Sequence, residues 1–269
     1  MPAVSVIIAA LEAEDFLGEA VDSVLAQSFG DFEIVIAPDE PRDYGRFAAR
    51  DSRIRVLPGV PAPTGPGPAR NRALATATGD WIALLDADDL WSPNYLAALL
   101  PQAETAGAAF GRTSVLDTND RELRSIPPSV HYGSADFRVF EHAFGSFHAL
   151  ARRTPDRRWR DILAEDVLFD LESLALAGGT APYVSASVYT LRRRAHSATR
   201  RSAFIDNIDA QYRRIIETIE RGETMIGSPH RAAAVAVIES WVRMNAGFLT
   251  AAATTPGLEY QNYIFSLKL

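Results

Sequence analysis

Cysteine is absent from the 269-residue sequence. Its absence excludes disulfide cross-links, thiolate metal sites and cysteine nucleophiles, and it leaves the redox compartment open. Positive charge is also scarce, because 27 basic residues face 34 acidic ones and the formal net charge is −7. Proteins dedicated to nucleic acid usually carry a positive field that matches the phosphate backbone. We therefore expect a small-molecule partner and no nucleic acid.

Long apolar runs are missing as well. The stretch from Val4 to Leu11 is shorter than the ~20 residues of a membrane-spanning helix, and no basic flank or cleavage site marks it as a signal peptide. Farther along, Glu239, Arg243 and Asn245 interrupt the most apolar helical segment. The sequence thus predicts a cytoplasmic protein without a transmembrane segment.

Short apolar runs alternate with helical stripes in most of the chain. Continuous β-branched runs, of which Val4 to Ala10 is the first, are typical of strands covered on both faces, and the order strand, helix, strand predicts a βαβ unit. We therefore predict an α/β fold with a mostly parallel central sheet flanked by helices. Strands are expected at residues 4–10, 32–37, 54–57, 81–85, 108–116 and 183–191, and helices at 16–25, 69–78, 93–105 and 161–177.

The other segments differ in character. Residues 58–68 are rich in proline and glycine and predict a loop, and residues 119–144 are polar and predict a variable segment on the acceptor side. After residue 200 the pattern is purely helical. We accordingly predict a domain of residues 1–200 and a C-terminal helical extension of residues 201–269. The apolar faces of this extension suit a homodimer or peripheral contact with the inner face of a membrane.

Three carboxylates, those of Asp86, Asp88 and Asp89, follow directly on the buried strand at residues 81–85. In open α/β sheets ligands lie beyond the carboxyl ends of the strands. Carboxylates this close repel one another unless a cation neutralises them, and oxygen ligands favour Mg²⁺ or Mn²⁺ over zinc. A solvated, aspartate-rich turn that caps the next helix is the alternative.

Several segments, taken in their order along the chain, resemble the family 2 glycosyltransferases of the GT-A fold. The resemblance covers roughly residues 4 to 200. It implies an inverting enzyme that moves a sugar from a nucleotide-diphosphate sugar to an acceptor hydroxyl in polysaccharide or glycoconjugate synthesis, with Mn²⁺ or Mg²⁺ as cofactor. The acceptor class it implies is a carbohydrate, a lipid-linked molecule or another hydroxyl compound. The matching segments are Val4 to Ala10, Ala20 to Ser28, Asp31 to Ile36, Gly65 to Leu74, Asp86 to Asp88, Ala164 to Phe169 and Leu191 to Ser197.

The resemblance also assigns a donor site. In the family, two aspartates, a glycine and a serine usually follow the second strand, whereas here only Asp39 survives. Its carboxylate can accept an N–H of uracil or guanine, so a UDP-sugar is favoured and a GDP-sugar also fits. Arg70, at a helix start, can hold phosphates or a base edge, while Asn71 caps or packs. As alternatives, Asp39 is a turn residue and Arg70 a solvated one. The expected donor-binding residues are Ala9, Leu11, Asp39, Arg70, Asp86 and Ala87.

Metal and proton-transfer roles follow from the same resemblance. Asp88 is the expected metal ligand, Asp89 supports it, and His196 completes the coordination unless it is an ordinary surface histidine. Asp166 matches the family's catalytic base, which takes the acceptor hydroxyl's proton, and Glu165 supports it. The alternative for this pair is a structural one, as carboxylates favoured by the dipole at a helix N-terminus.

Further residues carry weaker expectations. His148 is placed on a strand near the sugar, or else is an ordinary strand residue with satisfied hydrogen bonds. Trp159 is expected to stack on a sugar face, whereas Trp81 is a core residue. An arginine cluster suits a phosphate-bearing acceptor or a membrane surface, or else belongs to a solvated loop. Its members are Arg152, Arg153, Arg157, Arg158 and Arg160.

Two other functions fit an α/β sheet with acidic residues. A sugar-nucleotide nucleotidyltransferase usually has a glycine-rich basic loop after its first strand, but Ala10 to Glu14 is acidic and has no glycine. An inactive GT-A-fold binding protein stays open, since Ala37 and Pro38 depart from the family and the usual Tyr-Asn pair is missing after the first strand.

Overall fold

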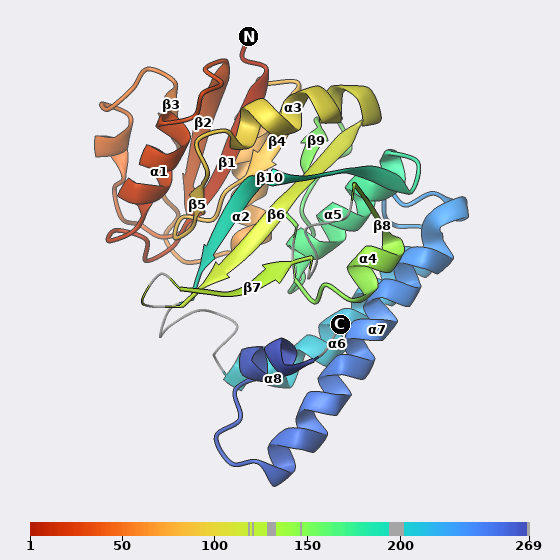
Figure 1. Ribbon diagram of the computed structural model, residues 1–269. Helices are drawn as coiled ribbons and strands as arrows, with labels where there is room; N and C mark the ends of the chain where they lie inside the picture. Colours follow the sequence, from red (N-terminus) through yellow and green to blue (C-terminus); the bar gives the residue numbers. More distant parts are fainter. Residues whose placement is uncertain (118, 120, 128–132, 146, 194–201, 268–269) are drawn as a thin grey trace.

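A mixed β-sheet forms the body of the molecule in the computed structural model, which describes residues 1–117, 119, 121–127, 133–145, 147–193 and 202–267. In these ranges the strand order is β3-β2-β1-β4-β9-β6-β10-β5, with β7 beside β6 and β8 beside β10 (Figure 1). The strands are β1 (Val4–Ala10), β2 (Phe32–Pro38), β3 (Ile54–Val56), β4 (Trp81–Leu84), β5 (Leu90–Trp91), β6 (Ala108–Leu116), β7 (Glu122–Ile126), β8 (Ser134–Asp136), β9 (Leu150–Arg152) and β10 (Thr180–Arg192).

The four strands β3-β2-β1-β4 are parallel, as the sequence predicts. β1 and β2 are buried almost throughout because helices cover both faces of this part of the sheet. In the second half, β6 and β10 are parallel, and β5, β7, β8 and β9 join them or β4 antiparallel. The expected α/β architecture is confirmed.

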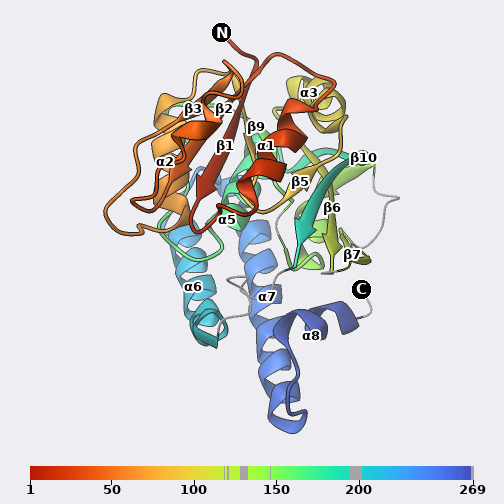
Figure 2. The ribbon, with the colours of Figure 1, turned by 90° about the vertical axis from the view of Figure 1, so that its left-hand side faces the viewer.

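Helices surround this sheet, and the last three lie together at the carboxyl ends of the parallel strands (Figures 1 and 2). In the described ranges every helix is too short or too polar to span a lipid bilayer. The helices are α1 (Leu17–Leu25), α2 (Pro66–Thr76), α3 (Tyr95–Ala106), α4 (Phe137–Glu141), α5 (Glu165–Leu176), α6 (Ser202–Glu220), α7 (Ser228–Thr254) and α8 (Tyr260–Ser266), with a short 3₁₀ turn at Gly45–Phe47.

Two sequence-based boundaries are wrong. The predicted loop at 58–68 ends early, because α2 begins at Pro66, where a missing N–H costs nothing, directly after Gly65 in a positive-φ conformation. Helix α5 begins only at Glu165, because Ala164 before it is left-handed at φ 61°. The described residues between 119 and 144 contain β7, β8 and α4, which the sequence pattern does not indicate, and the variable acceptor-side role of this segment stays a prediction. Short edge elements such as these carry too little periodicity to be recognised.

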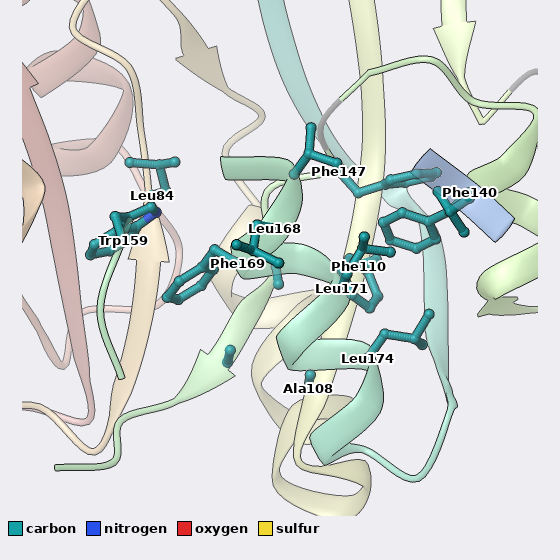
Figure 3. Packing of buried hydrophobic residues seen from close by; sticks show 14 of the residues in the cluster. Leu84, Ala108, Phe110, Phe140, Phe147, Trp159, Leu168, Phe169, Leu171 and Leu174 are labelled. Carbon is teal, nitrogen blue, oxygen red and sulfur yellow. The ribbon is translucent and has the colours of Figure 1, made fainter. Parts of the chain in front are cut away.

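The larger hydrophobic cluster runs from the sheet into the C-terminal helices. Phe110 of β6 contacts Phe140 and Phe147 edge-on, and Figure 3 shows these rings beside the apolar face of α5. Trp241 of α7 belongs to the same cluster and donates its indole N–H to the carbonyl of Phe140 at 3.1 Å. The division at residue 200 stays a prediction, but α6 and α7 pack on the same core as α4 and α5.

Candidate active site

A buried arginine joins two of the motifs that the sequence singles out. Arg70, in the first turns of α2, is 4% exposed. Its Nη2 lies 2.6 Å from Oδ1 of Asp86, which follows β4, and its Nη1 contacts the carboxylate of Glu165 at the start of α5. The alternative of a solvated Arg70 is therefore wrong. The Arg70 guanidinium thus joins two residues that lie 16 and 95 positions after it in the sequence, Asp86 and Glu165.

The pKa values of these two carboxylates shift in opposite directions. Burial tends to raise the pKa of Asp86, but Arg70 and then His148 lower it below its usual range, and the side chain keeps 34% of its exposure. For Glu165, burial outweighs the attraction of Arg70, and the charge of Asp166 adds to it, which raises the pKa to about 7. Asp86 is thus the anionic partner of Arg70 at neutral pH.

Asp166 follows Glu165 on α5 and is half-buried. Its charge, with those of Asp86 and Glu165, raises the pKa of Arg70 against the effect of burial. The structure therefore brings together four of the predicted residues, Arg70, Asp86, Glu165 and Asp166. Their assigned roles in donor binding and proton transfer stay predictions.

The rest of the acidic loop, which we define as Asp86 to Asp89, is fixed by β10. Asp89 is buried and accepts hydrogen bonds from the Tyr189 hydroxyl and the Arg192 N–H, both at 2.9 Å. Burial and the charges of Asp88 and Asp86 raise its pKa well above the usual range. Asp88 is half-buried, and its carbonyl accepts the Nε–H of Arg192 at 2.7 Å. Asp89 therefore fixes the loop to β10, and Asp88 is the more exposed of the two carboxylates. Their assigned roles at a metal stay predictions.

Asp39 holds a neighbouring loop in place. It is 2% exposed and accepts hydrogen bonds from the Thr64 N–H and hydroxyl and from the Gly65 N–H, at 2.6 to 3.0 Å. These contacts fix the chain just before α2 and give weight to the turn alternative. A role in recognising the nucleobase stays a prediction.

The remaining donor-site predictions lie at the same edge of the sheet. Ala9 pairs in register with Ala37, and Leu11 follows β1 with 46% exposure. Ala87 is buried within the acidic loop. His196 lies outside the described residues. Among the described ones, no three histidine, aspartate or glutamate side chains form a metal site by themselves.

One other expectation is wrong. Trp159 is 1% exposed, and its ring stacks on Phe169 at 4.5 Å, beside Leu84 in Figure 3, so it does not face a sugar. The side chain of Asn71 holds it there through both backbone groups of Trp159, at 2.7 and 2.8 Å. Arg157 is buried and donates to the Ser173 hydroxyl at 2.8 Å, whereas Arg152 and Arg158 are exposed.

Sequence reasoning missed two residues beneath the acidic loop. Tyr189 of β10 accepts the Asp86 N–H at 3.0 Å and donates to Asp89. Asp170 of α5 accepts backbone N–H groups from residues 147–149, and within that segment His148 has a φ of 51° and precedes β9 instead of lying on a strand. No local pattern signals either residue, because their partners are 21 to 103 residues away.

The raised pKa of Glu165 predicts a pH-dependent stability. A folded-state pKa of about 7, against an ordinary 4.5, gives stability that is fully present below pH 4.5 and is lost as the pH rises through 7. The group thus lowers the free energy of unfolding between pH 5 and 8 by on the order of 3 kcal/mol. We expect Glu165→Gln to flatten the pH dependence measured by urea unfolding.

Asp51→Asn is the control for this measurement, because Asp51 has a pKa of about 2 and does not titrate in that window. Equal slopes for wild type and Glu165→Gln would contradict the assignment.

Comparison with known proteins relates the chain to one family. The model described as Glycosyl transferase family 2 matches residues 5–156. Succinoglycan biosynthesis protein ExoO of Rhizobium meliloti (strain 1021) is 30% identical over 234 residues, covering 78% of this chain and 66% of that protein. The Escherichia coli UDP-Glc:alpha-D-GlcNAc-diphosphoundecaprenol beta-1,3-glucosyltransferase WfgD is 38% identical over 130 residues, 46% of this chain and 51% of that protein. The chain thus spans about half to two thirds of these relatives.

Solved structures show the same fold. S. aureus TarS 1-349 in complex with UDP-GlcNAc has a TM-score of 0.67 at 18% identity, over 97% of this chain and 78% of that one. The mannosyltransferase PcManGT from Pyrobaculum calidifontis, in complex with GDP-Man and Mn2+, has a TM-score of 0.62 at 18% identity, over 97% and 77%. At this level of identity the likeness concerns the fold alone.

Proposed function

Because the chain belongs to glycosyl transferase family 2, we propose that it transfers a sugar from a nucleotide-diphosphate sugar to an acceptor hydroxyl, with inversion at the anomeric carbon. The observation that carries this proposal is the contact of Arg70 with both Asp86 and Glu165, which places the acidic loop beside Asp166. A UDP-sugar is the favoured donor, as in the names of WfgD and of the TarS complex. A GDP-sugar, the ligand of PcManGT, is the second choice.

The donor set around the acidic loop fits a divalent cation. Asp88, which matches the family's metal-binding aspartate, is the proposed protein ligand, and Asp86 and Asp89 beside it are held by Arg70 and β10. Mg²⁺ and similar hard cations are commonly held by one or two carboxylates together with substrate phosphates. Mn²⁺ or Mg²⁺ bound there would offset the negative charge on the departing diphosphate. His196 is retained as a second proposed ligand.

Asp166 supplies the proposed base. As the acceptor oxygen forms its bond to the anomeric carbon, the bond from that carbon to the diphosphate breaks and its electron pair leaves with the nucleoside diphosphate. The acceptor's proton passes to the Asp166 carboxylate. Glu165 assists by holding Arg70, whose positive charge keeps Asp86 ionised.

The class of acceptor, the cellular location and the oligomeric state are also proposed. A lipid-linked sugar is the acceptor in the name of WfgD, and we propose this class for the chain, which would place it at the inner face of a membrane. We also propose that the apolar faces of α6 and α7 either pair two copies of the chain or contact the membrane.

Turnover of three donors tests the function. Wild-type protein would be incubated with UDP-Glc, UDP-GlcNAc or GDP-Man and Mn²⁺, with a GlcNAc-diphosphate lipid as acceptor, and ³¹P NMR would follow the products. Release of nucleoside diphosphate supports sugar transfer, and the one-bond C–H coupling constant at the new anomeric carbon reports inversion. Pyrophosphate would instead identify a nucleotidyltransferase. No turnover of any donor would favour an inactive binding protein.

A further inference from the structure

A buried carboxylate on α5 organises the chain before β9. Asp170 is 1% exposed. Its Oδ2 accepts the N–H groups of Phe147 and His148 at 2.9 and 3.2 Å, and its Oδ1 accepts that of Ala149 at 2.9 Å. Three consecutive backbone donors are therefore satisfied by one side chain, which compensates for burying its charge. The segment 147–149 is fixed relative to α5.

His148 extends this connection toward the acidic loop. It is 3% exposed, and its ring lies parallel to that of Tyr189, with centroids 3.8 Å apart and an interplanar angle of 1°. The Tyr189 hydroxyl in turn accepts the Asp86 N–H at 3.0 Å and donates to Asp89 at 2.9 Å. A continuous set of contacts thus leads from α5 to both ends of the acidic loop. We call Asp170, residues 147–149, the His148 ring and Tyr189 the support chain.

The support chain begins on the helix that carries the proposed base. Asp166 and Asp170 are four residues apart, one turn of α5. Any shift of α5 would therefore be transmitted to the acidic loop through packed rings and hydrogen bonds. Displacing a reacting group by about 1 Å can cost about 100-fold in rate, so a rigid link between these two elements has a use.

We propose that Asp170 is a positioning residue: through the support chain it sets where the acidic loop lies relative to Asp166. This assignment rests on the proposed function, because the separation of the acidic loop from Asp166 matters for sugar transfer only if both take part in it. The physical link itself, from Asp170 to the amide of Asp86, holds independently of any activity.

Hydrogen exchange tests the link without turnover. Asp170→Asn and Tyr189→Phe are expected to speed exchange in peptides covering residues 86–89 by at least about tenfold, since each removes acceptor capacity from the support chain. Glu172→Gln is the matched control: Glu172 lies on the same helix, is also 1% exposed, and accepts the Met225 N–H at 3.1 Å on another side.

The proposal requires faster exchange at 86–89 in Asp170→Asn than in Glu172→Gln at equal global stability, measured by urea unfolding. If Asp170→Asn speeds exchange only at residues 147–149, or no more than the control does, the role is merely local and the proposal is overturned.

Kinetics of two His148 variants give the second test. His148→Ala removes the stack, whereas His148→Phe keeps an aromatic ring on Tyr189, and both place a non-glycine residue at the same positive φ. We expect kcat to fall at least about tenfold in the alanine variant with little change in donor KM, and phenylalanine to restore most of it. Equal kcat losses in both variants would overturn the proposal. An inactive wild type would contradict the proposed function. The exchange result would still show whether Asp170 is connected to the acidic loop.

Discussion

Asp166→Asn is expected to lower kcat for sugar transfer by about 1,000-fold while donor KM changes little, because general base catalysis contributes about 10²–10⁴ in rate. Asparagine keeps the size of the side chain but cannot take the acceptor's proton. Steady-state release of nucleoside diphosphate in the presence of acceptor measures the loss. Asp161→Asn, an exposed carboxylate a few residues earlier, is the control and should behave as wild type.

A second variant separates proton transfer from folding. Asp166→Ala leaves room where the carboxylate was, and added formate should restore part of the activity if a base is what is missing. Normal kcat for Asp166→Asn in a folded protein would remove Asp166 from the mechanism and leave it with the dipole-favoured structural role that its position on α5 also allows.

Asp88→Asn is expected to lower kcat/KM and to weaken Mn²⁺ binding. Loss of an anionic metal ligand should cost several kcal/mol of transition-state stabilisation, about 1,000-fold in kcat/KM, and should raise the Mn²⁺ concentration needed for half-maximal activity. Titrating activity with Mn²⁺ measures both changes. Asp22→Asn on α1 is the control, since this carboxylate is 60% exposed and forms an ion pair with Arg50 at the surface.

Thermal unfolding with UDP and Mn²⁺ complements the kinetics, because a ligand that binds only the native state raises Tm. We expect a shift for wild type and Asp166→Asn, and a smaller shift for Asp88→Asn. A full shift in Asp88→Asn would show that the cation is held elsewhere.

Much of the site could be predicted because each motif is short in sequence. The carboxylates of the acidic loop follow a strand whose apolar run is unmistakable, and the Glu165-Asp166 pair stands at a helix start. The same runs predict that these strands are parallel, whereas the order β3-β2-β1-β4 comes from the structure. What the sequence does not show is which side chain joins the motifs. Arg70 contacts both, although the general expectation for an arginine on a helix is solvation.

The missed features have one physical cause: they arise from contacts between distant segments. Asp170 in the middle of α5 has the pattern of a solvated helix residue, and only the fold brings three N–H groups to it. Trp159 has an amphipathic ring that suits a sugar face, but its ring stacks on Phe169 and its backbone is hydrogen-bonded to the Asn71 side chain. Sequence periodicity contains no information about such pairings.

The indole N–H of Trp241, which donates to the Phe140 carbonyl, ties α7 to α4. Exchanging α6 to α8 for the helices of another family member would require moving α4 with them. Otherwise the Phe140 carbonyl would keep the Ala143 N–H but lose the indole donor, and the Trp241 ring would lose its packing partners. Recombination between relatives should therefore tolerate a crossover near β6 better than one at the chain's turn into α6.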